Sequence, residues 1–219
     1  MDLPASPFTL PWLLLAHLLA WGFVLHALLH ADWRRFRDRE SLHIYLATTV
    51  GVMVLWQIQG RLASGLHVHL LGATLLALMF GWCFAFIALA LVASLELVNG
   101  HMEAASLGLN LCLNGLIPIS CSWLCAWLVV HRLPHNYFVY IFMACFAGAA
   151  LSIAASGLAG GLLLSLTADA PRLGHAHLSA ALLLMFPEAF LTGMLLTLFT
   201  AYTPQWVTTF RDELYIHRH

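Results

Sequence analysis

Residues 69–99 read HLLGATLLALMFGWCFAFIALALVASLELVN, an almost wholly apolar stretch. This stretch decides the fold because it allows two interpretations: one long tilted membrane helix, or two short helices that form a hairpin at Gly81-Trp82. The apolar character continues on both sides of it. Continuous apolar stretches predict helices over residues 12–30, 42–59, 69–81, 84–99, 106–130, 136–166 and 178–203.

The composition is typical of a membrane protein. Of the 219 residues, 62% are hydrophobic and 9% are charged, and the mean hydropathy is +0.87. A soluble domain is about half apolar and about a quarter charged. Seven spans of about 20 residues would occupy roughly 140 positions, which leaves room only for loops and short tails. We therefore expect residues 1–219 to form a single polytopic domain in a lipid bilayer. The net charge of −1 argues against nucleic acid as a partner.

The arginines favour the hairpin, because positive charge concentrates on the cytoplasmic side of a membrane. All nine Lys and Arg residues of the chain are arginines. With a hairpin and an outward N-terminus, only Arg61 and Arg172 lie outside; a single long helix gives a nearly even split. We predict an all-α protein with about seven transmembrane helices, its N-terminus outside and its C-terminus in the cytoplasm. The short third and fourth spans should be broken or shielded by neighbouring helices. The start of the chain does not fit a cleavable signal peptide.

Histidine is the main functional signal, with 13 in the chain. His67-Val68-His69 is the sharpest local feature, since two imidazoles two residues apart on extended chain project to one side. Both could reach a metal ion, or one could hold the other. His26 and His30 lie one helical turn apart, as in some metal and haem sites, or face lipid headgroups. Two further groups, His101 with Glu103 and His175 with His177, fall in predicted outer loops.

Glu188 lies inside the last apolar span, directly after Pro187. A carboxylate at membrane depth costs about 2.5–3.5 kcal/mol, so it needs a partner. One interpretation is a structural contact, either with backbone groups that Pro187 leaves free or with Asn110 and Asn114. The other is a role in moving protons or cations. Glu96, near the end of the fourth span, raises the same question.

The sequence does not support an enzyme. It has no nucleophile–base constellation, and the HxxHH boxes of di-iron membrane hydroxylases are absent. The phosphate-binding pattern G-x-x-x-x-G-K-[ST] is also absent, so any energy source must be a partner.

Three segments resemble those of a known family: SGLHVHLLG at 64–72, LGLN at 107–110 followed by Asn114, and PEAFLTG at 187–193. In this order and spacing they are similar to the CbiM/NikM family, the substrate-binding membrane components of energy-coupling-factor cobalt and nickel importers. The resemblance covers about residues 42–204. It implies a seven-helix protein with an outward N-terminus in the bacterial cytoplasmic membrane. It also implies a coupling membrane subunit and cytoplasmic ATPases as partners.

The resemblance also implies a metal site. In that family the terminal amine, the next backbone nitrogen, a histidine at position two and a histidine entering the third helix hold the metal in square-planar nitrogen geometry. Sets of four nitrogen ligands suit Ni²⁺ and Co²⁺. The last of these ligands corresponds to His69. Asp2 stands where the family has its histidine at position two, and His67 could supply the missing nitrogen. The expected ligands are therefore Met1, Asp2, His67 and His69, with the metal as substrate.

The aspartate at position two leaves three outcomes open: an altered ligand set for a similar metal, a changed metal preference, or loss of the site. It also motivates a second hypothesis, a non-transporting membrane scaffold or accessory subunit of a larger complex built on the same fold.

Overall fold

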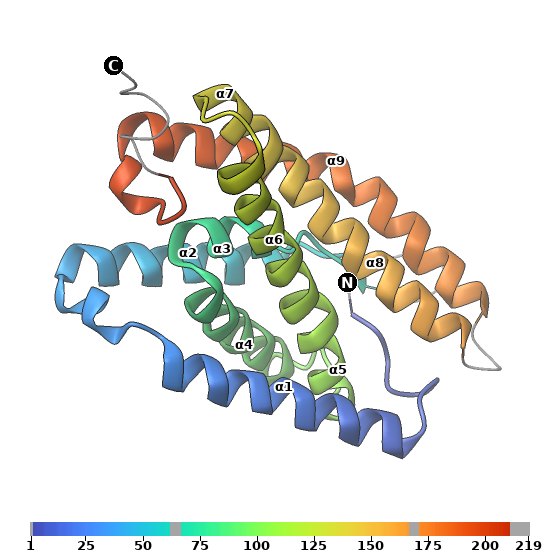
Figure 1. The fold of residues 1–219 in the computed structure, drawn as a ribbon. Coiled ribbons are helices and arrows are strands. Elements are labelled where there is room, and N and C mark those ends of the chain that lie inside the picture. The colour runs from blue at the N-terminus through green and yellow to red at the C-terminus, as the bar shows by residue number, and fades with distance from the viewer. Residues whose placement is uncertain (1, 62–66, 167–170, 211–219) are drawn as a thin grey trace.

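The computed structural model describes residues 2–61, 67–166 and 171–210 (Figure 1). Each segment expected to be a membrane helix contains a helix, but the third begins only at Ala73: residues 69–72, which were expected to be helical and include His69, are not. The main helices are α1 (Leu10–His30), α2 (Arg39–Gln57), α3 (Ala73–Phe80), α4 (Trp82–Val98), α5 (Leu107–Leu111), η3 (Cys112–Leu116), α6 (Ile117–Arg132), α7 (Tyr137–Val139), η4 (Tyr140–Ala147), α8 (Gly148–Ser165) and α9 (Pro171–Tyr202). Short 3₁₀ turns occur at η1 (Trp33–Arg37), η2 (Ala104–Ser106) and η5 (Pro204–Trp206).

Helices α3 and α4 form the predicted hairpin. Gly81 joins them with a φ of 84°, a conformation that residues with a Cβ rarely adopt. All eight residues of α3 are buried, and a helix of that length rises only about 12 Å. It is therefore too short to cross the hydrocarbon core, and neighbouring helices enclose it. The prediction that this pair is shielded by other helices is confirmed.

Four of the described helical segments are long and apolar enough to span a membrane: Leu10–His30, Ala104–Arg132, Tyr137–Ser165 and Pro171–Tyr202. Helix α4 is apolar but shorter. Large apolar side chains such as Leu14, Leu29 and Phe186 are exposed on these segments, as expected for surfaces that contact lipid. The count of seven crossings and the orientation stay predictions.

Helices α8 and α9 pack closely through small residues (Figure 1). A Cβ on Gly157 would lie 2.1 Å from the Ala181 Cβ, and one on Gly160 would lie 2.4 Å from His177 Nε2. The glycines of α8 therefore allow the two helices to approach.

The N-terminal segment runs back from the start of α1 into the middle of the bundle (Figure 1), where Asp2 and Leu3 are buried. There it meets a small antiparallel sheet of β1 (Gly60–Arg61) and β2 (His67–Val68), which pairs Gly60 with Val68. This meeting point lies directly before α3 in the chain, so it is where the expected metal ligands can be compared.

Candidate metal centre

The His67-Val68-His69 segment is extended, as predicted. One edge of β2 pairs with β1. On the other edge, the Asp2 backbone N–H donates to the His67 carbonyl oxygen at 3.1 Å. Backbone pairing thus places residue 2 beside the histidine pair, although 65 positions separate residues 2 and 67 in the chain.

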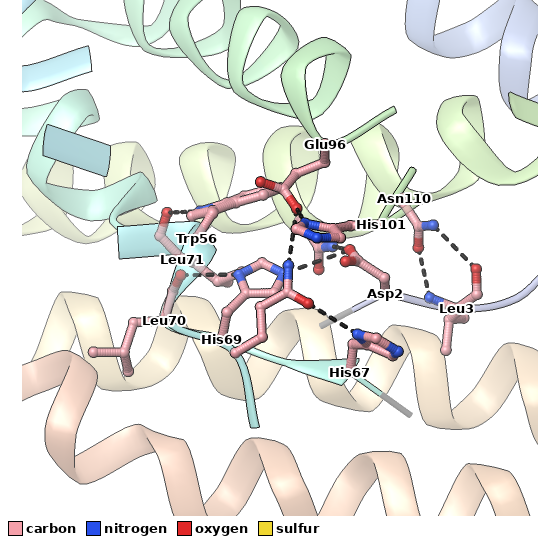
Figure 2. Close-up of polar contacts among 12 residues, drawn as sticks. Asp2, Leu3, Trp56, His67, His69, Leu70, Leu71, Glu96, His101 and Asn110 are labelled. Carbon is pink, nitrogen blue, oxygen red and sulfur yellow. Dashed lines mark hydrogen bonds and ion pairs between the residues drawn. The ribbon is translucent and has the colours of Figure 1, made fainter. Parts of the chain in front are cut away.

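The side chains of Asp2 and His69 face each other (Figure 2). His69 Nε2 lies 3.4 Å from Asp2 Oδ1, and Asn114 Nδ2 donates to the same oxygen at 3.0 Å. His69 Nδ1 donates to the Leu70 carbonyl at 3.0 Å, which leaves Nε2 as the nitrogen directed at Asp2. The His69 ring also packs on Trp56, with the ring centroids 4.2 Å apart. Both members of the pair are buried.

The Asp2 carboxyl stays ionised. Burial alone would raise its pKa, but the positive charge of the chain's amino terminus, one residue away, acts in the opposite direction. The neighbouring His69 imidazole adds to this effect, and the net result is a pKa well below the ordinary value of Asp2. The site therefore presents an anionic oxygen next to an imidazole nitrogen, a combination that suits a divalent cation.

Side chains from the segment before α6 hold the N-terminal residues in place. Asn110 Oδ1 accepts the Leu3 N–H at 2.8 Å, and Asn110 Nδ2 donates to the Leu3 carbonyl at 3.0 Å. Asn110 and Asn114 lie four positions apart where α5 passes into the π-helical turn η3, so both amides face the N-terminal segment. Glu103 Oε2 accepts the Ala5 N–H at 3.0 Å.

The ring of His67 is oriented by a hydrogen-bonded chain (Figure 2). His67 Nδ1 lies 2.8 Å from Gln59 Oε1, and Gln59 Nε2 donates to Glu96 Oε2 at 2.8 Å. His101 Nδ1 lies 3.1 Å from the same Glu96 oxygen, and Gln57 donates to the other one. Both oxygens of the buried Glu96 carboxylate therefore have partners: an amide on one, and an amide and an imidazole on the other. These hydrogen bonds compensate for its burial.

Glu188 also has partners on both oxygens, and they are not those expected from the sequence. Its Oε2 accepts the Leu71 N–H and its Oε1 accepts the Gly72 N–H, each at 2.8 Å. Asn110 and Asn114, the side-chain partners considered for it, bond instead to the N-terminal segment. Glu188 thus fixes the backbone that joins His69 to the N-terminus of α3, where a negative charge is favourable.

The structure brings together only part of the expected ligand set. Asp2 and His69 are in contact, His67 joins them through its backbone, and Met1 lies outside the described residues. Among the described residues, no three His, Cys, Asp or Glu side chains are close enough to hold a metal ion. A complete ligand set here therefore requires donors other than these side chains, such as backbone or terminal nitrogens.

Of the two other predicted groups of histidines, one includes a residue near this centre: the buried His177 lies close enough to Asp2 for the carboxylate charge to act on its ring. His26 and His30 stack with their ring centroids 4.1 Å apart, and His30 Nδ1 bonds to the His26 carbonyl. The expectation of an outer loop containing His175 and His177 is wrong, because α9 already begins at Pro171. His177 is buried against Gly160, whereas His175 is exposed.

Sequence reasoning missed Gln57 and Gln59. Polar residues at the end of an apolar helix are ordinary at a membrane boundary, so no local signal marked them.

Comparison with known proteins decides the family. The sequence profile of the family described as the cobalt uptake substrate-specific transmembrane region, CbiM, matches residues 2–206. The chain belongs to the CbiM family. CbiM membership confirms the resemblance noted in the sequence, and it makes the chain a multi-pass membrane protein of metal uptake and not an enzyme.

Solved structures support the CbiM fold. A truncated transition-metal transporter matches with a TM-score of 0.77 and 19% identity, over 92% of this chain and 99% of that one. A second transition-metal transporter structure matches with a TM-score of 0.75 and 18% identity, over 92% and 93% of the two chains. At such identities the likeness establishes the fold alone. No curated protein sequence matches the chain.

Proposed function

We propose that the chain is the substrate-binding membrane subunit of an energy-coupling-factor importer for Co²⁺ or Ni²⁺. The observation that carries the proposal is the buried contact between Asp2 and His69, which are 67 positions apart in the chain. Backbone pairing to β2 and the Asn114 amide hold Asp2 there, and the Asn110 amide holds the adjacent Leu3. Such elaborate placement of residue 2 is consistent with a site that uses the start of the chain as a ligand.

In the proposed site the metal is held by the Met1 amine, the Asp2 backbone nitrogen and carboxylate, and His69 Nε2. The His67 backbone pairs with Asp2 at the rim of this four-donor set, and the His67 ring lies outside the set. The Asp2 N–H now donates to the His67 carbonyl. Metal binding through the Asp2 nitrogen would release the amide proton to solvent and remove that hydrogen bond, so loading should loosen the contact between residue 2 and β2. Three nitrogens and one carboxylate oxygen still suit Ni²⁺ and Co²⁺.

For transport, a conformational change that the cytoplasmic partners drive must be transmitted to this site. Helix α3 provides a connection, because Glu188 holds the two residues directly before it and the segment after η5 holds its last residues. Thr208 and Thr209 bond to the carbonyls of Met79 and Leu78 at the end of α3. We propose that the coupling subunit and its ATPases act on this end of the helix, with the N-terminus outside and the C-terminus in the cytoplasm of a bacterium.

The test is isothermal titration of the purified protein with a free N-terminus, using Ni²⁺, Co²⁺, Cu²⁺ and Zn²⁺. We expect one tight site, which His69→Ala and a glycine inserted after Met1 each weaken at least 100-fold. His175→Ala, which removes an exposed imidazole from α9, is the matched control and should leave the affinity unchanged. Tight binding that survives the double change His67→Ala and His69→Ala would overturn the proposed site.

A scaffold or accessory function remains the second candidate. The absence of three clustered ligating side chains among the described residues favours it. It predicts that the purified protein binds no metal with its native N-terminus, and that the chain copurifies with proteins other than an ATPase-driven coupling complex.

A further inference from the structure

A polar cavity lies next to the Asp2–His69 contact. Its volume is about 170 Å³, and its wall includes two imidazoles and two carboxylates, those of His67, His101, Asp2 and Glu103. The His101 side chain is 39% exposed, whereas Asp2 on the inner side is 7% exposed. The cavity therefore leads from an accessible imidazole to the buried proposed site.

Hydrogen bonds at Nδ1 orient both rings (Figure 2). The Glu96 carboxylate can only accept, so Gln59 turns its NH₂ toward Glu96 and its carbonyl oxygen toward His67. His67 Nδ1 must then carry a proton, and so must His101 Nδ1, which also faces Glu96. Nε2 is therefore the nitrogen of each ring that remains for a metal ion. Within the described part of the chain, the structure records hydrogen bonds of these two rings only at Nδ1.

This arrangement matches that of histidines which bind metals. A metal-binding imidazole almost always donates its other N–H to a carboxylate or carbonyl, which orients the ring and makes the ligating nitrogen more basic. Here one buried carboxylate, Glu96, supports both rings, directly for His101 and through Gln59 for His67. A network that served only to tie α2 to α4 would not need two imidazoles on the wall of one cavity.

We propose that His67 and His101 form an outer position for a divalent transition-metal ion, which takes the hydrated ion from solvent before it reaches Asp2 and His69. Imidazole nitrogens select borderline ions such as Co²⁺, Ni²⁺ and Zn²⁺ over Mg²⁺ and Ca²⁺, which prefer oxygen ligands. With two protein nitrogens the ion keeps several waters, so it binds weakly and can leave. Only the direction of passage rests on the proposed function; the outer position itself does not.

The experiment titrates wild type and His101→Ala with Co²⁺ and Ni²⁺. Binding is measured by calorimetry and, for Co²⁺, by the visible absorption of the bound ion. We expect wild type to bind one ion tightly and a second ion at least 10-fold more weakly. His101→Ala should remove the weak site and change the affinity of the tight site less than threefold. In stopped-flow mixing, the variant should load its tight site at least fivefold more slowly at limiting metal. His175→Ala serves as the control imidazole deletion.

A second variant, Glu96→Gln, tests the support of the rings and should weaken the outer position by roughly 10- to 100-fold. If wild type shows a tight site only, or if His101→Ala binds as many ions and loads as fast, the inference is overturned and the proposed function stands. If the weak site is present but no tight site exists, the proposed function is overturned and the outer position stands.

Discussion

The Glu188→Gln substitution tests whether the carboxylate in α9 fixes the loop of the proposed metal site. Both carboxylate oxygens accept backbone N–H groups, from Leu71 and Gly72, at 2.8 Å, and the side chain is buried. A hydrogen bond to a charged group contributes about 1.5–3 kcal/mol. Glutamine keeps one acceptor and turns an NH₂ group toward the other N–H, which loses one bond and leaves buried donors unsatisfied.

The unsatisfied donors cost about 1–3 kcal/mol more, and relief from burying a charge offsets part of the sum. We therefore expect the free energy of unfolding to fall by about 2–4 kcal/mol. Because Leu71 and Gly72 directly follow the His69 segment, metal affinity should also fall about 10-fold, which corresponds to roughly 1.4 kcal/mol of loop ordering.

Unfolding in detergent micelles and calorimetric metal titration measure the two effects. Glu40→Gln is the matched control, because Glu40 is exposed and the hydrogen bond that its carboxylate accepts from the Trp206 indole N–H, at 3.1 Å, can be kept by a glutamine oxygen. Its stability should change by less than about 0.5 kcal/mol. If Glu188→Gln is as stable as this control, the carboxylate does not anchor the loop, and a role in moving protons or cations would have to be considered again.

Three further predictions concern the same region. Asn110→Ala removes both hydrogen bonds to the Leu3 backbone, so calorimetry should show metal affinity at least 10-fold weaker. Gly72→Ala places a Cβ at a φ of 65° and 3.0 Å from Val52 Cγ2, and thermal unfolding should report a loss of at least about 1–2 kcal/mol. Burial raises the pKa of the Asp2 carboxyl, but the neighbouring amine and imidazole lower it below its ordinary value of 3.8. Its ionisation therefore contributes stability that is present above about pH 4 and is lost as the pH falls through the lowered pKa. Asp2→Asn should flatten the acid limb of a plot of unfolding free energy against pH below about pH 4.

The helices were largely predictable because membrane helices are encoded by local apolar runs. The hairpin at Gly81 followed from the charge distribution, and the glycine's positive φ now explains it. The ends of helices were less accurate. Helix α2 starts at Arg39 because Asp38 caps it through the N–H groups of Glu40 and Ser41, and α9 starts at Pro171, before its apolar run begins.

The site was predictable only in part. The spacing of His67 and His69 indicated an extended pair, and the resemblance to CbiM/NikM proteins pointed to residue 2 as their neighbour. No local pattern could reveal that Glu188 bonds to Leu71, because 117 positions separate them. A buried carboxylate shows in sequence that a partner exists, but only the packing of α9 beside the start of α3 identifies it.

Two buried carboxylates restrain opposite ends of the loop that carries the histidines. Glu96 on α4 holds the His67 end through Gln59, and Glu188 on α9 holds the end at Leu71 and Gly72. Both oxygens of each carboxylate already accept hydrogen bonds from protein groups, which suits anchoring better than carrying a proton or a cation. Because the anchors stand on different helices, a shift of α9 relative to α4 would stretch the loop and move His69 away from Asp2. In this arrangement the geometry of the loop depends on helix packing. The proposed importer would need this property in order to release a bound ion.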